Sequence, residues 1–211
     1  MSEQEGVIKF QLEFSKGDFI TTDDITELDC WRHICYRLQL IGQDVNRYEG
    51  YGFGNISQRH PQLANQFFIS GTQTGGASYL QATEYALVTD CQPMSNRIAA
   101  CGQTKPSSEA MTHGQVYQLN HNASCIIHAH CPEIWRNADA LNIPQTSAEV
   151  PYGTVQMAQE VMRLFNETDV LTQKIFSMRG HEDGVVCFGQ NWQMTCHQII
   201  NMLARAIQIQ Q

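Results

Sequence analysis

Residues 124–130 form the segment of this 211-residue chain that most restricts its fold. The run Cys125-Ile126-Ile127-His128-Ala129-His130 places apolar residues on both faces of an extended chain. Strands that are buried on both faces have such near-continuous apolar runs, whereas a strand with one face in water alternates apolar and polar residues. The segment therefore predicts a central strand that other elements cover on both sides.

Helical and extended patterns alternate along the rest of the chain. Strands are predicted at 7–14, 52–57, 66–71, 85–89, 97–101, 175–178 and 185–188, and helices at 22–42, 108–120, 154–165 and 191–209. The last two helices are expected to bury Val155, Ala158, Met162 and Phe165, and Trp192, Cys196, Ile199, Leu203 and Ile207. The pattern shows no repeat and no linker. It predicts one mixed α/β domain over residues 1–211, with residues 1–20 as an N-terminal extension that contains a strand.

Charge and cysteine content exclude several classes of function. The formal net charge is −8, and no basic run is present, so nucleic acid is not expected as a partner. The acidic start Met-Ser-Glu-Gln-Glu-Gly has no signal-peptide core, and no apolar run is long enough to span a membrane, so a soluble cytoplasmic protein is expected. Eight cysteines without a Cys-x-x-Cys pair predict reduced thiols and exclude a zinc ribbon.

Three histidines form a candidate metal site. His128 and His130 are two residues apart in a predicted strand, so their side chains share one face and can reach the same ion. His181 lies in a predicted turn between two apolar strands, from which it can complete a three-histidine set. Three imidazoles with an open fourth position are typical of catalytic zinc. Taken singly, the strand pair can also be two ordinary polar histidines, and His181 a turn residue exposed to water.

The tetrapeptide Pro106-Ser107-Ser108-Glu109 precedes the predicted second helix. Hydroxyl groups and backbone amides at a helix start can bind an oxyanion, helped by the positive end of the helix dipole. Glu109 beside a metal could then accept a proton. An N-cap serine followed by an acid that compensates the dipole explains the same residues without any ligand.

Five ordered motifs resemble the class II aldolase/adducin family over residues 25–208. They are Gly54-Asn55-Ile56-Ser57, the loop Phe68-Ile69-Ser70-Gly71-Thr72-Gln73-Thr74-Gly75, Pro106-Ser107-Ser108-Glu109, His128-Ala129-His130, and His181 before a Gly-Val-Val strand. The resemblance implies a three-layer αβα fold with a central mixed, mostly antiparallel sheet, in a homotetramer. It also implies a site that binds zinc or another divalent metal through His128, His130 and His181, with Glu109 as the catalytic acid/base.

The resemblance further implies a substrate and a reaction. Positions that match Asn55, Thr74, Gly75, Ser107 and Ser108 hold the substrate phosphate in the family's phosphate enzymes. We therefore expect an aldolase, a carbon–carbon lyase of carbohydrate metabolism, which acts on a small, phosphorylated ketose through metal-stabilised enediolate chemistry. A sugar-phosphate dehydratase or epimerase with the same site is the alternative enzyme, and an adducin-like interaction module without catalysis is the alternative outside enzymes.

The chain departs from the family pattern at three points, of which the first two lie beside the expected pocket. His181-Glu182-Asp183-Gly184 stands where the family usually has His-Gly, and the loop at 70–75 is two residues longer than the shorter form of the family. The family's aldolases also use a tyrosine near the C-terminus, from a neighbouring subunit, to protonate the leaving aldehyde. No tyrosine follows Tyr152, which is therefore the candidate for this second acid, although it can equally be an ordinary half-buried loop tyrosine.

Overall fold

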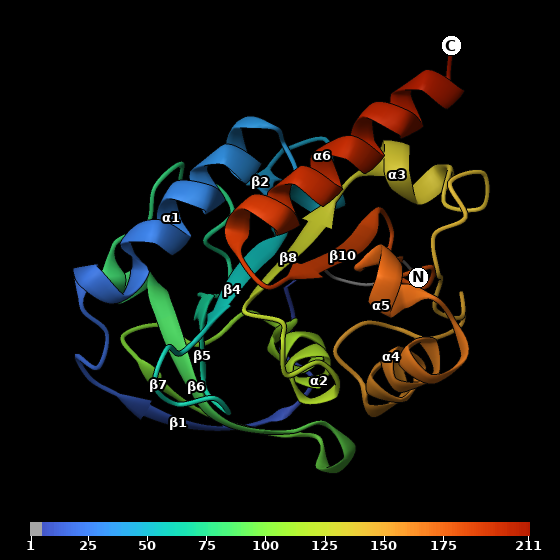
Figure 1. Cartoon of the computed structure of the whole chain (residues 1–211). Helices are drawn as coiled ribbons and strands as arrows, with labels where there is room; N and C mark the ends of the chain where they lie inside the picture. The colour runs from blue at the N-terminus through green and yellow to red at the C-terminus, as the bar shows by residue number, and fades with distance from the viewer. Residues whose placement is uncertain (1–5) are drawn as a thin grey trace.

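The computed structural model describes residues 6–211, so residues 1–5 of the predicted domain 1–211 lie outside the described residues. A sheet of eight strands runs through the molecule in the order β1-β7-β6-β5-β4-β8-β10-β9 (Figure 1). The strands are β1 (Gln11–Lys16), β4 (Asn55–Arg59), β5 (Phe67–Ser70), β6 (Tyr85–Gln92), β7 (Arg97–Gly102), β8 (Cys125–His130), β9 (Ile175–Ser177) and β10 (Gly184–Gly189). A separate short hairpin joins β2 (Gly42–Gln43) to β3 (Gly52–Phe53).

The strand pairing confirms a mixed, mostly antiparallel sheet. β1 runs parallel to β7 at one edge, and the other pairs within this sheet of the described chain are antiparallel. β8 lies between β4 and β10, and its six residues are buried. The near-continuous apolar run at 125–130 is therefore a central strand, as predicted.

Helices cover both faces of the sheet, which gives the expected three layers (Figure 1). One face carries α1 (Thr22–Arg37), α3 (Pro132–Arg136) and α6 (Trp192–Ile209), and the other carries α2 (Ala110–Leu119), α4 (Val155–Glu167) and α5 (Val170–Gln173). Three single-turn segments, η1 (Tyr48–Gly50), η2 (Ala82–Glu84) and η3 (Pro93–Ser95), lie in the connections. Each face of the sheet has its own apolar core. The short helices α3 and α5 were not among the predicted elements.

Several predicted boundaries and faces are wrong. The predicted helix 22–42 ends at Arg37, because Gln39 adopts a left-handed conformation and turns the chain back so that Leu40 bonds to the carbonyl of Cys35. The predicted strand at 7–14 is β1, shifted to Gln11–Lys16. The prediction that the second helix begins at 108 with a serine cap is also wrong, because α2 begins at Ala110 and its cap position is Glu109.

The inward faces of two helices also differ in part from the prediction. In α4, Met162 is exposed, while Val161 and Leu164 are buried, because the rotation of the helix is set by its packing on α2 and the sheet. In α6, Ile207 is exposed because it lies on the same side of the helix as the exposed Ile200, whereas Ala206 beside it is buried. All eight cysteines are free thiols. No helix within residues 6–211 is long and apolar enough to cross a bilayer.

Candidate metal centre

Two of the predicted metal residues, His128 and His130, lie at the C-terminal end of β8, on the face that carries α2 and α4. Alternation along the strand decides this, because Ile127 and Ala129 belong to the core under α1 and α6, whereas Ile126 belongs to the core under α2 and α4. His128 and His130 lie two and four residues after Ile126, so their side chains point to the same face of the sheet as that of Ile126. The sequence prediction that the two histidines share one face is therefore confirmed.

The structure brings His181 to this pair. One ring nitrogen from each of His128, His130 and His181 can be chosen so that the three atoms lie within 4.8 Å of one another. The Nε2 atoms of His130 and His181 are 3.1 Å apart, and the ring centres of the three pairs are 4.8–5.2 Å apart. All three side chains are buried. The arrangement is a compact cluster of nitrogen donors from two segments that are 51 residues apart.

Burial keeps two of these rings neutral. It lowers the pKa of His130 to about 3, with a smaller opposing contribution from the carboxylate of Asp183. Burial also lowers the pKa of His128 well below its usual value, and the neighbouring His130 and His181 reinforce the shift. A neutral imidazole has a lone pair to give to a metal, so the donor set suits a divalent ion. The residues present therefore fit the expected group.

A tight turn between β9 and β10 positions His181. The amide of His181 bonds to the carbonyl of Met178, and the amide of Gly184 bonds to the carbonyl of His181. A Cβ atom at Gly184 would lie 2.6 Å from Cδ2 of the His181 ring, so a side chain here would displace the histidine. Gly184 is also paired with His130 across β10 and β8. Because glycine has no side chain, this pairing leaves room beside the His130 ring.

Asn55 and the start of α2 border the histidine cluster. Asn55 is paired directly with His128 across β4 and β8, so both side chains lie on the same face. Its Oδ1 atom is buried without a hydrogen-bond partner among residues 6–211. Glu109 is buried at the cap position of α2, and the amide of Glu109 bonds to the hydroxyl of Ser107.

Two contacts place this helix start at the cluster. His113, one turn after Glu109, lies close enough to lower the pKa of His128. The carbonyl of Ser108 approaches Gly153, the neighbour of Tyr152, and the Tyr152 ring lies 4.6 Å from the ring of His181. The tetrapeptide 106–109 and the three histidines thus border one region, as the sequence predicted.

The loop with Thr74 and Gly75 packs against the β2–β3 hairpin. A Cβ atom at Gly75 would lie 2.2 Å from the carbonyl oxygen of Gly42, so this close approach requires glycine. The loop is also tied to α1 by Arg32, which is fully buried and was not among the predicted site residues. Its guanidinium donates to the carbonyls of Thr74 and Ala77, both at 2.8 Å. A charged residue between Leu28 and Cys35 on an apolar helix face is the sequence signal that could have revealed it.

Tyr152 lies in the apolar core beside His181 and is fully buried, which excludes the half-exposed loop position. Its hydroxyl accepts the amide proton of Val7 at 3.1 Å. The ammonium group of Lys9 lies 3.8 Å from the centre of the Tyr152 ring and donates to its carbonyl. The segment before β1 therefore packs on the cluster side of the molecule, a contact that no sequence pattern had indicated.

A second set of residues beside the histidines was also missed. The Tyr48 ring meets the His130 ring edge-on with centres 4.7 Å apart, and its hydroxyl donates to Oδ2 of Asp183 at 2.6 Å. Arg47 donates to the same hydroxyl at 2.6 Å. Tyr48 and Asp183 are separated by 135 positions. Asp183 lies in the 181–184 segment that departs from the family pattern, but Tyr48 belongs to no noted motif, so no sequence pattern indicated that the two residues meet.

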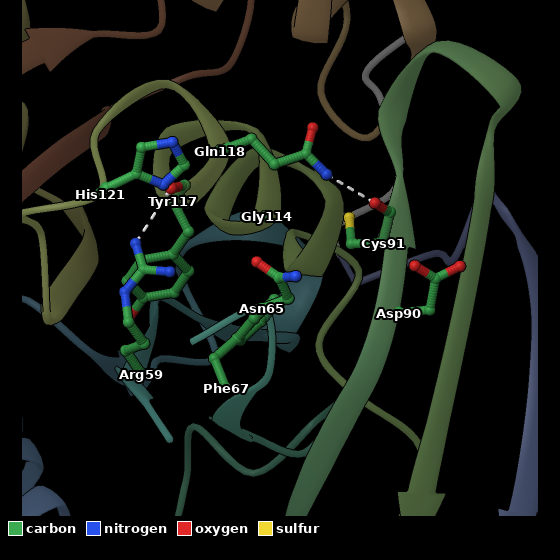
Figure 2. Close-up of a pocket in the computed structure, with 9 residues that line it drawn as sticks. All are labelled: Arg59, Asn65, Phe67, Asp90, Cys91, Gly114, Tyr117, Gln118 and His121. Carbon is green, nitrogen blue, oxygen red and sulfur yellow. Dashed lines mark hydrogen bonds between the residues drawn. The ribbon is translucent and has the colours of Figure 1, made fainter. Parts of the chain in front are cut away.

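A cavity of about 260 Å³ lies at the other end of α2, away from the histidines (Figure 2). Arg59 and Tyr117 line it, and the guanidinium donates to the carbonyls of Tyr117, Asn120 and Ala123 at 2.8–3.1 Å, and also to that of Ala64. Gln118 donates to the carbonyl of Cys91 (Figure 2). The hydrogen bonds of Arg59 satisfy backbone carbonyls at and just beyond the C-terminal end of α2.

The order of the motifs and the three-histidine cluster agree with a comparison to known families. Residues 44–210 match the family described as Class II Aldolase and Adducin N-terminal domain. The chain belongs to this family. The match covers most of the chain, including Glu109, Tyr152 and the three histidines of the cluster. No curated protein matches the chain in sequence.

Solved structures show the same fold at low identity. YgbL of Klebsiella pneumoniae, described as a candidate aldolase/epimerase/decarboxylase, is 18% identical, with a TM-score of 0.63 over 89% of this chain and 88% of that one. An L-fuculose 1-phosphate aldolase is 16% identical, with a TM-score of 0.63 over 92% and 90%. A sugar-phosphate aldolase of Thermotoga maritima is 17% identical, with a TM-score of 0.58 over 89% and 93%. These likenesses establish the fold.

Proposed function

We propose that this chain is a zinc-dependent aldolase, a carbon–carbon lyase that acts on a small, phosphorylated ketose. The observation that carries the proposal is the cluster of His128, His130 and His181, whose nitrogens lie within 4.8 Å of one another beside the start of α2. Family membership and the sugar-phosphate aldolases among the structural relatives support the lyase class. The retained histidines and Glu109 argue against a non-catalytic adducin-like module.

His128, His130 and His181 would hold the metal. Three imidazole ligands leave a coordination position open, as in catalytic zinc sites, and other divalent ions also accept such a donor set. When bound, the ion supplies a Lewis acid that polarises a substrate carbonyl. The protein provides the fixed donors, the buried surroundings and the groups that move protons.

The residues around the cluster have distinct proposed roles. Glu109 accepts and returns the proton that moves when the carbon–carbon bond breaks or forms, and its burial at a helix start keeps it at one place. Tyr152 is the proposed second proton-transfer residue, because its ring packs on His181. Both are expected to act on the substrate bound at the histidines.

The substrate phosphate is assigned to Asn55, Thr74, Gly75, Ser107 and Ser108. Asn55 lies beside His128, and the helix start at 107–109 offers amides and hydroxyls at the positive end of the α2 dipole. Ser107 is linked to the strand before the Thr74–Gly75 loop, because its amide bonds to the carbonyl of Ser70. This link connects the two halves of the proposed phosphate site.

We also propose that the protein forms a homotetramer in the cytoplasm, because the family it resembles does. Light scattering of the purified protein tests the assembly, with a mass of about four chains expected for a chain of 23.9 kDa. A monomer would contradict the assembly and leave the site unaffected.

The function is tested first by metal content and then by turnover. Mass spectrometry of protein purified without added metal or chelator should find about one zinc per chain, and the His128→Ala variant should lose it. Dihydroxyacetone phosphate with a panel of short aldehydes should then give condensation products. Loss of water from a ketose phosphate, or its epimerisation without condensation, would replace the lyase by a dehydratase or an epimerase. Absence of metal even after reconstitution would overturn the enzyme proposal.

A further inference from the structure

Two loops that are distant in sequence meet beside His130. The first loop connects β2 to β3 and contains Arg47 and Tyr48, and the second connects β9 to β10 and contains His181 and Asp183. The hydroxyl of Tyr48 donates to Oδ2 of Asp183 at 2.6 Å and accepts from Nη2 of Arg47 at 2.6 Å. Arg47 and Asp183 also form an ion pair at 3.7 Å. One hydroxyl therefore links a cation and an anion across the two loops.

This group packs directly on a proposed metal residue. The Tyr48 ring meets His130 edge-on at 4.7 Å, and Phe53 approaches the same histidine at 5.6 Å. The guanidinium of Arg47 stacks over both of these aromatic rings, at 4.9 and 4.6 Å. The His130 ring therefore contacts two aromatic rings besides its partner histidines, and Arg47 packs on both of these rings.

The backbone of both loops is held in an unfavourable conformation. Tyr48, Glu49 and Asp183 all have left-handed φ angles, between 49° and 61°, which residues other than glycine seldom adopt. Such conformations persist where surrounding contacts over-determine them, and they concentrate at functional sites. The contacts among Arg47, Tyr48 and Asp183 are suited to hold these two turns in place.

Asp183 retains an unused acceptor in this arrangement. Its side chain is 6% exposed, and its Oδ1 atom is buried without a hydrogen-bond partner among residues 6–211. A buried carboxylate oxygen without a partner is costly, whereas its Oδ2 atom is bonded to Tyr48. The carboxylate is thus fixed by one oxygen, with the other available inside the site.

We propose that Arg47, Tyr48 and Asp183 form a clamp that positions His130 for metal binding. The inference rests on the proposed three-histidine metal site and adds three residues to it, none of which was a predicted site residue. Outer residues that fix the orientation of a metal-bound histidine typically contribute a factor of 10–100 to metal affinity. Tyr48 and Asp183 are therefore positioning residues, and they act on the metal through His130 and the two loops.

Two conservative variants test the clamp. Tyr48→Phe keeps the ring against His130 and removes only the hydroxyl, and Asp183→Asn keeps the shape and removes the charge. Zn²⁺ affinity is measured by competition with a chromophoric chelator, and Co²⁺-substituted protein is followed by its visible absorption spectrum. Each variant should bind Zn²⁺ about 10–100-fold more weakly and show an altered Co²⁺ spectrum. The double variant should be little weaker than either single one, because the residues act as a unit.

Controls separate this role from simple destabilisation. Tyr79→Phe makes the same chemical change at an exposed tyrosine that stacks on His33, and should leave Zn²⁺ affinity and the Co²⁺ spectrum unchanged. A Tyr48→Phe protein that melts at lower temperature but binds Zn²⁺ as tightly as the wild type would overturn the clamp alone. A wild-type protein that binds no metal would overturn the metal site and the clamp together.

Discussion

Helix α2 begins beside three histidines and ends beside the cavity that Arg59 lines, and both regions are rich in polar groups. At the C-terminal end, the guanidinium of Arg59 donates to four carbonyls of the chain, three of them from residues 117–123. At the N-terminal end, Oδ1 of the buried Asn55 has no hydrogen-bond partner within residues 6–211. The two ends therefore differ in whether the chain satisfies its own polar groups.

That difference indicates where a ligand can act. Buried polar groups in native proteins are normally hydrogen-bonded, so a group whose partner is missing from the chain points to a bound ion, water or substrate. Arg59 donates hydrogen bonds to carbonyls that the end of a helix leaves without partners, so its contacts do not point to a bound ligand. The cavity in Figure 2 is consequently a structural feature, and the functional region is the end of α2 with the histidines.

The largest effect is expected from His128→Ala. Loss of one of three donors should abolish stoichiometric metal binding and reduce the proposed aldol cleavage by about 10⁴-fold or more. The protein should remain folded, because its other core contacts persist. Metal analysis, circular dichroism and a coupled activity assay check these three outcomes. An unfolded variant would instead show that the metal is structural.

Glu109→Gln should have the next largest effect, because it removes the proton acceptor and keeps the shape of the side chain. The activity should fall by about 10³-fold, within the range typical of general acid–base catalysis. Metal content should not change. A variant with normal turnover would exclude Glu109 from catalysis, and a variant without metal would instead assign it to the metal site.

The buried histidines should make the metal-free protein sensitive to acid. Burial lowers the pKa values of His113 and His130 to about 3, below the value of about 6.5 in an unfolded chain. The unfolded state then binds more protons between these values, so the contribution of these histidines to stability is constant above about pH 7 and is lost as the pH falls below 6.5. At pH 5 the loss is about 2 kcal/mol for each of these two histidines, and His128, whose pKa burial also lowers, adds to the loss.

Urea denaturation in the presence of a chelator, at pH 7 and pH 5, measures this loss. His113→Gln should reduce the difference between the two pH values by about 2 kcal/mol, because one of the titrating groups is removed. Equal stability at both pH values would show that the rings are protonated or exposed in the folded protein.

Arg59→Met tests the opposite end of α2 and should have the smallest effect. Loss of the carbonyl contacts should lower the free energy of unfolding by about 2 kcal/mol, since the half-buried site allows water to replace part of them. Metal affinity should remain within twofold of the wild type. Weaker metal binding in a folded Arg59→Met protein would show that the two ends of α2 are coupled and would remove the contrast between them.

The sequence pattern predicted the direction of side chains more accurately in a strand than in the helices. The alternation in 125–130 was enough to predict a central strand and to place His128 and His130 on one face, because strand geometry fixes side-chain direction. The predicted buried faces of two helices are partly wrong, because Met162 and Ile207 were expected in the core but are exposed. A helix can rotate or extend beyond its neighbours, so periodicity alone leaves its exact buried face open.

The sequence by itself determined the mixed α/β class, the central strand and the family, because these depend on local periodicity and on the order of short motifs. Only the tertiary structure decided that Arg32 holds the Thr74 loop and that Tyr48 and Asp183 meet beside His130. Those contacts join segments that are 42 and 135 residues apart. Side-chain contacts over such separations depend on how loops are folded back against the sheet, and no local pattern encodes that geometry.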